Sequence, residues 1–427
     1  MVYIIGALAA ANILFALLAL KKGVRPGALA AMWADGAKQS LTVVKVMLII
    51  GAVTAIWRAA GTIAVSVYYG IQLITPHLFL PVAFLLTALL SYALGTSFGI
   101  VGTVGVIFMT LARSGGIDLT VTGGVLFSAI MVGDRGSPVS SSAVTVAELT
   151  GTDLFGNVRR MLRSGAIPFA LCCLVYALLA VRHPIHAVDP AVMERFRAEF
   201  QFTLWAFLPA LLMLFLPLFR VPIVWCMGLS IASGALTAHF LQNIPWGEVL
   251  RCCVLGYAAR SADLADIING GGIVSMLDTC AIVVLACSCS GIFRGTELLS
   301  SLEKHAERLA GRIGTFPALI LICLAASSLF CNQIIAIVMG RNLLGPVYEK
   351  LGKGREQLAL DIENTAITLP AFIPWCILSS VPLKLMGVGY GCLRYAVFLY
   401  AVPLVNMAAS LLRDRAHRRS AGRAALS

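Results

Sequence analysis

The chain has 427 residues, of which 59% are hydrophobic and 12% are charged, and its formal net charge is +12. A mean hydropathy of +0.91 excludes a soluble globular protein, because so much apolar surface cannot be hidden in a soluble core. The basic residues lie in short loops and at the C-terminal end, which indicates membrane topology signals rather than a nucleic-acid-binding surface. We therefore expect an all-α polytopic membrane protein.

About ten stretches are apolar enough to cross roughly 30 Å of hydrocarbon, the shorter ones with help from re-entrant or broken geometry. In the first stretch the positive charges of Lys21, Lys22 and Arg25 follow the apolar run, the reverse of a secretory signal, so we expect a retained span. In chain order the predicted spans are residues 1–20, 41–60, 79–94, 98–112, 164–181, 200–218, 221–241, 276–293, 315–330 and 393–412.

The order of these stretches predicts two structural repeats joined by a central pair of spans. Residues 181–198 are the most polar internal stretch and are expected to form the connecting loop, whereas residues 260–272 favour a surface helix and turn. The basic tail is expected in the cytoplasm, with the protein in the cell membrane. The predicted domains are an N-terminal span and loop (1–40), a first repeat (41–181), a connecting loop with central spans (182–274), a second repeat (275–412) and a tail (413–427).

The two repeats are related by a constant shift of 236 residues, at which polar breaks interrupt apolar runs. Unpaired backbone at membrane depth is tolerated only where it is buried in protein or lines a cavity, so the pattern predicts re-entrant hairpins followed by discontinuous helices. Interrupted segments at matching places in two halves point to a transporter's binding site. The matched positions are Arg58 and Arg294, Ser91 and Ser327, Gly95-Thr96-Ser97 and Cys331-Asn332-Gln333, Pro138 and Pro374, and Gly151 and Gly387.

Polar side chains at the hairpin tips and breaks are the candidate ligands of a transported ion or solute. Amides and hydroxyls at membrane depth are costly without a partner, so either a neighbouring helix or a ligand must satisfy them. For the serines, helix capping or packing is an equal alternative. The candidates are Thr96, Ser97, Asp134, Ser137, Ser140, Ser141, Asn332, Gln333, Glu363, Asn364, Thr365 and Thr368.

Two of these candidates, Asp134 and Glu363, are acids that could carry protons. An ionisable group inside the membrane is a functional-site hypothesis by default. Asp134 neighbours Arg135 and could instead form a structural ion pair with it. Glu363 has no adjacent cation and lies in an apolar setting, with a helix-end or lipid-interface position as its alternative role.

The segments around these residues resemble the NhaC family of sodium/proton antiporters, over residues 30–405. Gly95-Thr96-Ser97-Phe98-Gly99 is similar to the family's first hairpin, Gly133-Asp134-Arg135-Gly136-Ser137-Pro138-Val139-Ser140 to its first signature, and Ile362-Glu363 with Ile373-Pro374-Trp375 to its second. The resemblance implies inverted repeats, alternating access with the site between the repeats, and a homodimer. Related members exchange organic anions such as malate and lactate.

At three positions the chain departs from the family pattern by having a neutral residue where an acid is usual. Ser141 stands in place of an aspartate after the first break, Cys331-Asn332 in place of Gly-Asp, and Glu363-Asn364 in place of Glu-Asp. Hydroxyl, amide and carbonyl oxygens can still hold sodium, a hard cation. Proton exchange, however, is left to Asp134 and Glu363.

The sequence thus predicts a secondary transporter in which Na⁺ and H⁺ compete for Glu363, with Asp134, and which needs no resident cofactor or metal. One alternative is ion-coupled exchange or symport of a small organic solute such as malate or lactate, which a positive pocket around Arg135 would favour. Another is a membrane scaffold or sensor that has lost transport. An enzyme is not expected, because no paired catalytic acids, metal cluster or nucleophile with a base is readable.

Overall fold

The computed structural model of the chain describes residues 2–73, 78–95, 97–182, 194, 197–219, 221–261, 264–265, 268–295 and 303–424. These residues form helices and connecting turns, with one isolated antiparallel β-bridge between Tyr257 and Gly270. The predicted connecting loop at 181–198 lies largely outside the described residues. The prediction of an all-α membrane protein is confirmed.

Long helices and short ones alternate along the chain. The α-helices are α1 (Val2–Lys21), α2 (Pro26–Ala59), α3 (Thr62–Leu73), α4 (Phe79–Leu94), α5 (Ser97–Ile100), α6 (Val106–Ser114), α7 (Leu119–Gly136), α8 (Ser141–Thr150), α9 (Leu154–Arg182), α11 (Leu208–Phe215), α12 (Ile223–Phe240), α13 (Trp246–Leu255), α15 (Leu277–Gly295), α16 (Glu303–Ile313), α17 (Thr315–Phe330), α18 (Gln333–Lys350), α19 (Arg355–Thr365), α20 (Ile377–Met386) and α21 (Val397–Ala424). A π-helical turn (Val101–Gly105) joins α5 to α6, and 3₁₀ turns lie at Leu204–Phe207, Leu216–Phe219, Val274–Met276, Leu369–Phe372 and Tyr390–Tyr395.

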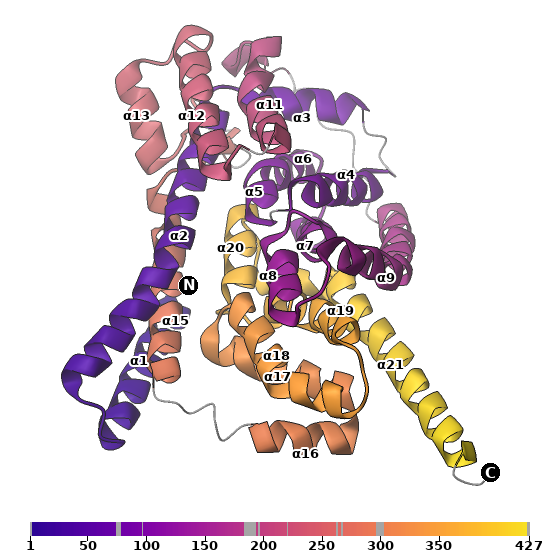
Figure 1. Cartoon of the computed structure of the whole chain (residues 1–427). Helices are drawn as coiled ribbons and strands as arrows, with labels where there is room; N and C mark the ends of the chain where they lie inside the picture. The colour runs from indigo at the N-terminus through magenta and orange to yellow at the C-terminus, as the bar shows by residue number, and fades with distance from the viewer. Residues whose placement is uncertain are drawn as a thin grey trace.

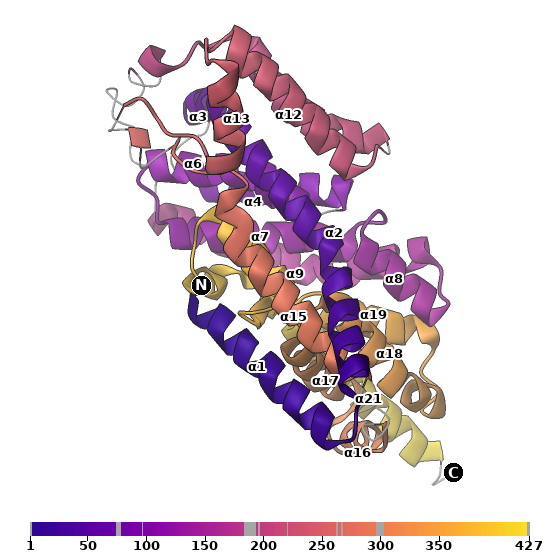
Figure 2. The same cartoon turned by 90° about the vertical axis from the view of Figure 1, so that its left-hand side faces the viewer.

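In space, the helices form three groups (Figure 1). Helices α1, α2 and α15 pack along one side, α4 to α9 occupy the middle, and α16 to α19 lie below them. Helices α12 and α13 pack against α2 near its C-terminal end (Figure 2). By length and composition, five helices of the described part could cross a membrane, or six if the pair formed by Arg355–Phe372 and Ile377–Met386, bent by 56°, counts as one span. Five further apolar helices are shorter.

Several predicted spans have different limits in the structure. The span predicted at 41–60 begins at Pro26, because a proline at the first helical position starts a helix without losing a hydrogen bond, so the predicted loop before it is helical. The span predicted at 393–412 continues to Ala424. Residues 200–218 contain only the eight-residue α11 between two 3₁₀ turns, with Pro209 in the first turn of α11 and Pro217 in the second 3₁₀ turn.

The shift of 236 residues relates the helix limits of the two halves. Helix α4 corresponds to α17, and Ser97–Ser114 corresponds to α18. The residue that ends α4, Gly95, and the residue that ends α17, Cys331, both have left-handed backbone conformations, with φ of 61° and 56°. The domain limits and the inverted relation of the halves stay predictions.

Each hairpin tip contacts the break of its own half. A Cβ atom on Gly95 would lie 2.6 Å from the backbone carbon of Val139, in the break between α7 and α8. In the second half the Cys331 carbonyl accepts a hydrogen bond from the Ile377 amide at 3.2 Å, at the start of α20. These contacts bring backbone and polar side chains of the tips and breaks to the centre of the molecule.

Candidate functional site

Asp134, in the last turn of α7, is surrounded by hydrogen-bond donors from both halves. The hydroxyl groups of Ser140 and Ser142 donate to its backbone carbonyl at 2.6 and 3.0 Å, and they approach carboxylate Oδ1 at 3.4 and 3.3 Å. From α18, Gln333 Nε2 donates to Oδ2 at 3.2 Å. The helix ends at Gly136 because the following Pro138 cannot continue the ladder, which leaves the Asp134 carbonyl for the serines. Donors from both halves therefore hold a 7% exposed carboxylate.

Asp134 lines a cavity of about 470 Å³. Ser97 also lines it, and its buried hydroxyl has no hydrogen-bond partner in the structure. Ser141 is exposed at the cavity wall. The other lining residues are Leu94, Gly95, Phe98, Val139, Pro217, Val221, Ile223, Gln333 and Leu378.

Arg135 follows Asp134 in the chain but bonds elsewhere. Its Nε and Nη2 atoms donate to Asn364 Oδ1 at 3.1 and 2.5 Å. Nη1 donates to the Met161 carbonyl at 3.0 Å and Nη2 to Ser164 Oγ at 2.7 Å. The predicted Asp134–Arg135 ion pair is therefore wrong, because consecutive side chains on a helix do not face each other. With its guanidinium occupied and 2% exposed, Arg135 also does not create a positive pocket for a solute.

Glu363, on α19, is sealed in the interior with an exposed fraction of 0%. Neither carboxylate oxygen has a hydrogen-bond partner in the structure. The charged groups that act on it are Arg135 and Asp134, so the two acids share one electrostatic environment. Glu363 lies in the last turn of α19, which ends at Thr365, so the structure agrees with the helix-end alternative. The lipid-interface position is wrong, because Glu363 and the neighbouring Ile362 and Ala366 are fully buried.

The remaining candidates divide between roles in local structure and contacts across the halves. Asn332 caps α18, its Oδ1 accepting from the Ile334 amide at 2.9 Å. The hydroxyls of Thr365 and Thr368 donate to carbonyls of their own helix turn, those of Asp361 and Asn364. Ser137 Oγ accepts from the Val139 amide within the break, and Thr96 lies outside the described residues. Of the second-half candidates, Gln333, Asn364 and Glu363 thus interact with the Asp134–Arg135 segment.

The comparison with known families decides what kind of protein carries this site. The model of the Na⁺/H⁺ antiporter family matches residues 1–153 and 129–409. The chain belongs to the Na⁺/H⁺ antiporter family. This antiporter-family protein is a multi-pass membrane protein and a secondary active transporter.

Curated relatives of this antiporter-family protein have different stated substrates. A malate-2H⁺/Na⁺-lactate antiporter of Bacillus subtilis is 23% identical over 373 residues, covering 86% of this chain and 79% of the relative. The Na⁺/H⁺ antiporter NhaC of Alkalihalophilus pseudofirmus is 23% identical over 383 residues, with coverage of 87% and 82%. An arginine/ornithine antiporter of Halobacterium salinarum is 23% identical over 354 residues, with coverage of 80% and 73%.

A third buried acid of the antiporter-family protein escaped the sequence analysis. Asp361 is 2% exposed, and its carboxylate accepts hydrogen bonds from Tyr348 OH and Gln357 Nε2, both at 2.7 Å. The expectation that only two acids lie in the interior is therefore wrong. The available signal was the position of Asp361 in the otherwise apolar stretch from Leu358 to Ile362, two residues before Glu363. Its donors give Asp361 a structural role that Glu363 lacks.

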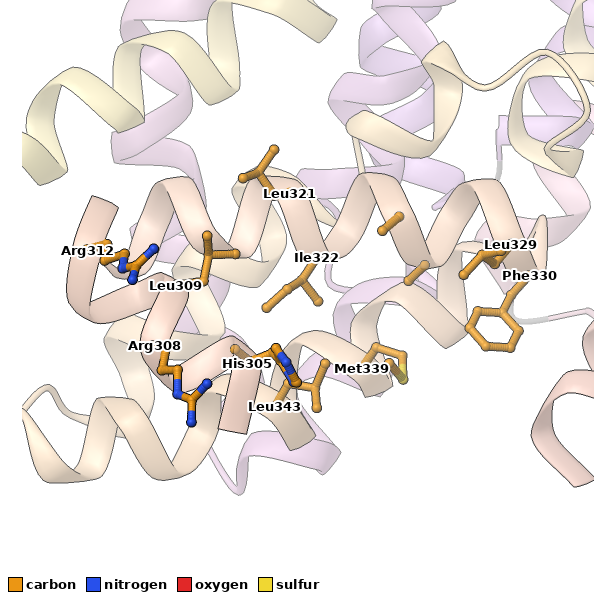
Figure 3. A pocket seen from close by; sticks show the side chains of 13 residues that line it. His305, Arg308, Leu309, Arg312, Leu321, Ile322, Leu329, Phe330, Met339 and Leu343 are labelled. Atoms are coloured by element: carbon orange, nitrogen blue, oxygen red, sulfur yellow. The ribbon is translucent and has the colours of Figure 1, made fainter. Parts of the chain in front are cut away.

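A larger cavity, of about 530 Å³, lies away from these acids between α16, α17 and α18. Its walls are mainly aliphatic, from Leu309, Ile322 and Leu343 among others, and its polar side chains are His305, Arg308 and Arg312 on α16 (Figure 3). No acid lines it. Size alone therefore does not identify the ion site, whereas the smaller cavity reaches a carboxylate.

Proposed function

We propose that the protein exchanges Na⁺ for H⁺ by alternating access, with the Asp134–Glu363 pair as the shared site. The proposal rests on two neighbouring acids that differ in their access to a cavity. Asp134 reaches a cavity, whereas Glu363 is sealed beside it with two unpartnered oxygens. An ionised carboxylate without hydrogen bonds is costly to bury, so a proton or a cation must offset its charge.

In this mechanism the cation enters the cavity and is held at Asp134. Sodium prefers oxygen ligands, and the unpartnered Ser97 hydroxyl and the Gln333 amide stand at the same cavity. Arg135 is fixed to Asn364 and balances one of the two negative charges. One negative charge of the pair is then left, which either a proton or one Na⁺ can neutralise. Binding both at once would give the site a net positive charge, which is unfavourable. The halves rock about this site, with their tips and breaks as the moving contacts.

Proton flux in proteoliposomes tests the proposal. A pH gradient is imposed, and Na⁺, Li⁺, K⁺, then malate or lactate as N-methylglucamine salts, are added to wild type, Glu363→Gln and Asp134→Asn. Glu307→Gln, an exposed acid on α16, is the matched control. We expect Na⁺ to collapse the gradient in wild type and control only. No response to any cation would overturn the proposal, and no response to any solute would favour a scaffold.

Exchange of a small organic solute is the second candidate function. A cavity of about 470 Å³ is within the usual range for small-molecule sites and larger than an ion needs. Its walls are mostly apolar with a few polar groups, as expected for such a site. The relative named as a malate/lactate antiporter adds support. Gradient collapse by malate or lactate in the absence of Na⁺ would favour this function.

Location and assembly extend the same proposal. We place the protein in the cell membrane with the basic C-terminus in the cytoplasm, as the positive-inside rule predicts. A homodimer, implied by the family resemblance, is part of the proposal. Cysteine labelling of the tail in sealed cells and the mass of the purified protein in detergent check these two points.

A further inference from the structure

A second polar cavity lies where the ends of three helices meet, and it is lined by three cations. Arg58 comes from α2, Arg113 from α6 and Lys384 from α20. The cavity has a volume of about 180 Å³, room for roughly six waters. Asn269, Gly270 and Ser275 close another wall, and no acid is among the lining residues that the structure describes.

Arg58 is incompletely satisfied at this cavity. Its Nη1 atom donates to the Thr54 carbonyl at 2.7 Å, but Nε is buried without a hydrogen-bond partner in the structure. Arg113 acts on Arg58 electrostatically, and like charges held close together repel. A planar guanidinium is suited to binding a carboxylate or phosphate through two parallel hydrogen bonds. An anion would therefore satisfy the free donor and relieve the repulsion.

The repeat supplies an internal comparison for this cavity. At the shift of 236 residues, Met109, Thr110 and Arg113 correspond to Gly345, Pro346 and Glu349, which line a cavity of about 90 Å³ in the other half. There the charges are mixed, with Arg355 Nε 4.0 Å from Glu349 Oε1. Lys384 likewise corresponds to Glu148. Two of the three cations, Arg113 and Lys384, thus have an acid at the equivalent position of the other half, whereas Arg58 corresponds to Arg294. Of these two cavities, the one of about 180 Å³ has only cations among its described charged lining residues.

We propose that the Arg58–Arg113–Lys384 pocket binds a small oxyanion, a carboxylate or a phosphate, either as a free solute or as an anionic lipid headgroup. Cation/proton exchange needs no such site, so the inference goes beyond the proposed function. The pocket is separate from the Asp134 cavity, since no residue lines both. A bound anion there bridges α2, α6 and α20, and would stabilise the contact between the halves.

Binding to the full-length protein in nanodiscs of phosphatidylcholine alone tests the proposal. Malate, lactate, phosphate and sulfate are titrated as N-methylglucamine salts at constant ionic strength, and the unfolding temperature and heat of binding are measured. We expect saturable stabilisation of wild type and at least tenfold weaker binding in Lys384→Gln and Arg58→Gln, because each loses a charge-assisted hydrogen bond. Arg341→Gln, at the mixed cavity, is the control and should bind as wild type does.

Nanodiscs containing phosphatidylglycerol distinguish the two sources of the oxyanion. Lys384-dependent stabilisation by this lipid, with solute binding reduced, would identify a headgroup, whereas undiminished solute binding would identify a free anion. The proposal is overturned if neither solutes nor phosphatidylglycerol stabilise the protein, or if binding is unchanged in both variants. Because Lys384 is only half-buried, its glutamine variant is expected to fold, and the unfolding temperature without ligand verifies this.

Discussion

At the residue scale, the contact between Arg135 and Asn364 joins the two halves beside the buried acids. Asn364→Ala removes the acceptor of two hydrogen bonds and leaves a buried guanidinium underpartnered. We expect a loss of about 2–4 kcal/mol of stability, visible as a lower unfolding temperature in detergent. Asn364→Asp, which restores an acid usual in the family, should retain the contact. Equal stability of all three proteins would contradict the assigned role.

At this scale the sequence predicted that two of the buried acids lie in the interior, but not the hydrogen-bond partners of their neighbours. Asp134 and Glu363 could be identified because acids in apolar runs are rare. The partner of Arg135 could not, since Asn364 is 229 positions away and only packing of the halves brings it near. Asn332, by contrast, has the cap position that its residue type favours, so a local role was the simpler interpretation.

At the element scale, the contact between the first hairpin tip and the break after α7 is a close backbone approach. Gly95 and Gly151 both end helices in the left-handed region, so alanine costs roughly 1–2 kcal/mol at either position. Only at Gly95 would the new Cβ collide with backbone, 2.6 Å from the Val139 carbon, whereas at Gly151 the nearest atom is 3.7 Å away.

We therefore expect Gly95→Ala to lower the unfolding temperature far more than Gly151→Ala, by about 3 kcal/mol or more in stability, and to impair transport. Purified variants in the same detergent give the comparison by thermal unfolding. Equal losses of stability in the two variants would show that the hairpin tip at Gly95 does not pack closely against the break at Val139.

The breaks were predictable at this scale, but some helices were not. In the sequence, Pro138 and Pro374 with their polar neighbours predict a break in each half. The structure has both breaks, one between α7 and α8 and the other before α20. Helices α7, α18 and α19 were not predicted as separate spans, because the polar residues that build the site reduce their hydropathy. Membrane-spanning patterns are thus weakest where the site lies.

At the scale of the whole molecule, the two halves related by the 236-residue shift meet at two acids, Asp134 and Glu363, which differ in their access to a cavity. Asp134 faces a cavity while Glu363 is closed off, an arrangement that the proposed mechanism expects of one state of its cycle. A glutamine at 363 removes the exchangeable proton but keeps the shape of the side chain. We expect Glu363→Gln to fold, with an unfolding temperature at or above that of wild type, and to lose coupled transport.

In the proposed mechanism, Na⁺ and H⁺ compete for the Asp134–Glu363 pair. The most direct measurement is proton release into weakly buffered solution when Na⁺ is added to the purified protein, with N-methylglucamine as the control cation. Wild type should release protons in proportion to the Na⁺ that it binds, and Glu363→Gln should release none. Sodium binding without proton release, or unchanged release in Glu363→Gln, would contradict this mechanism.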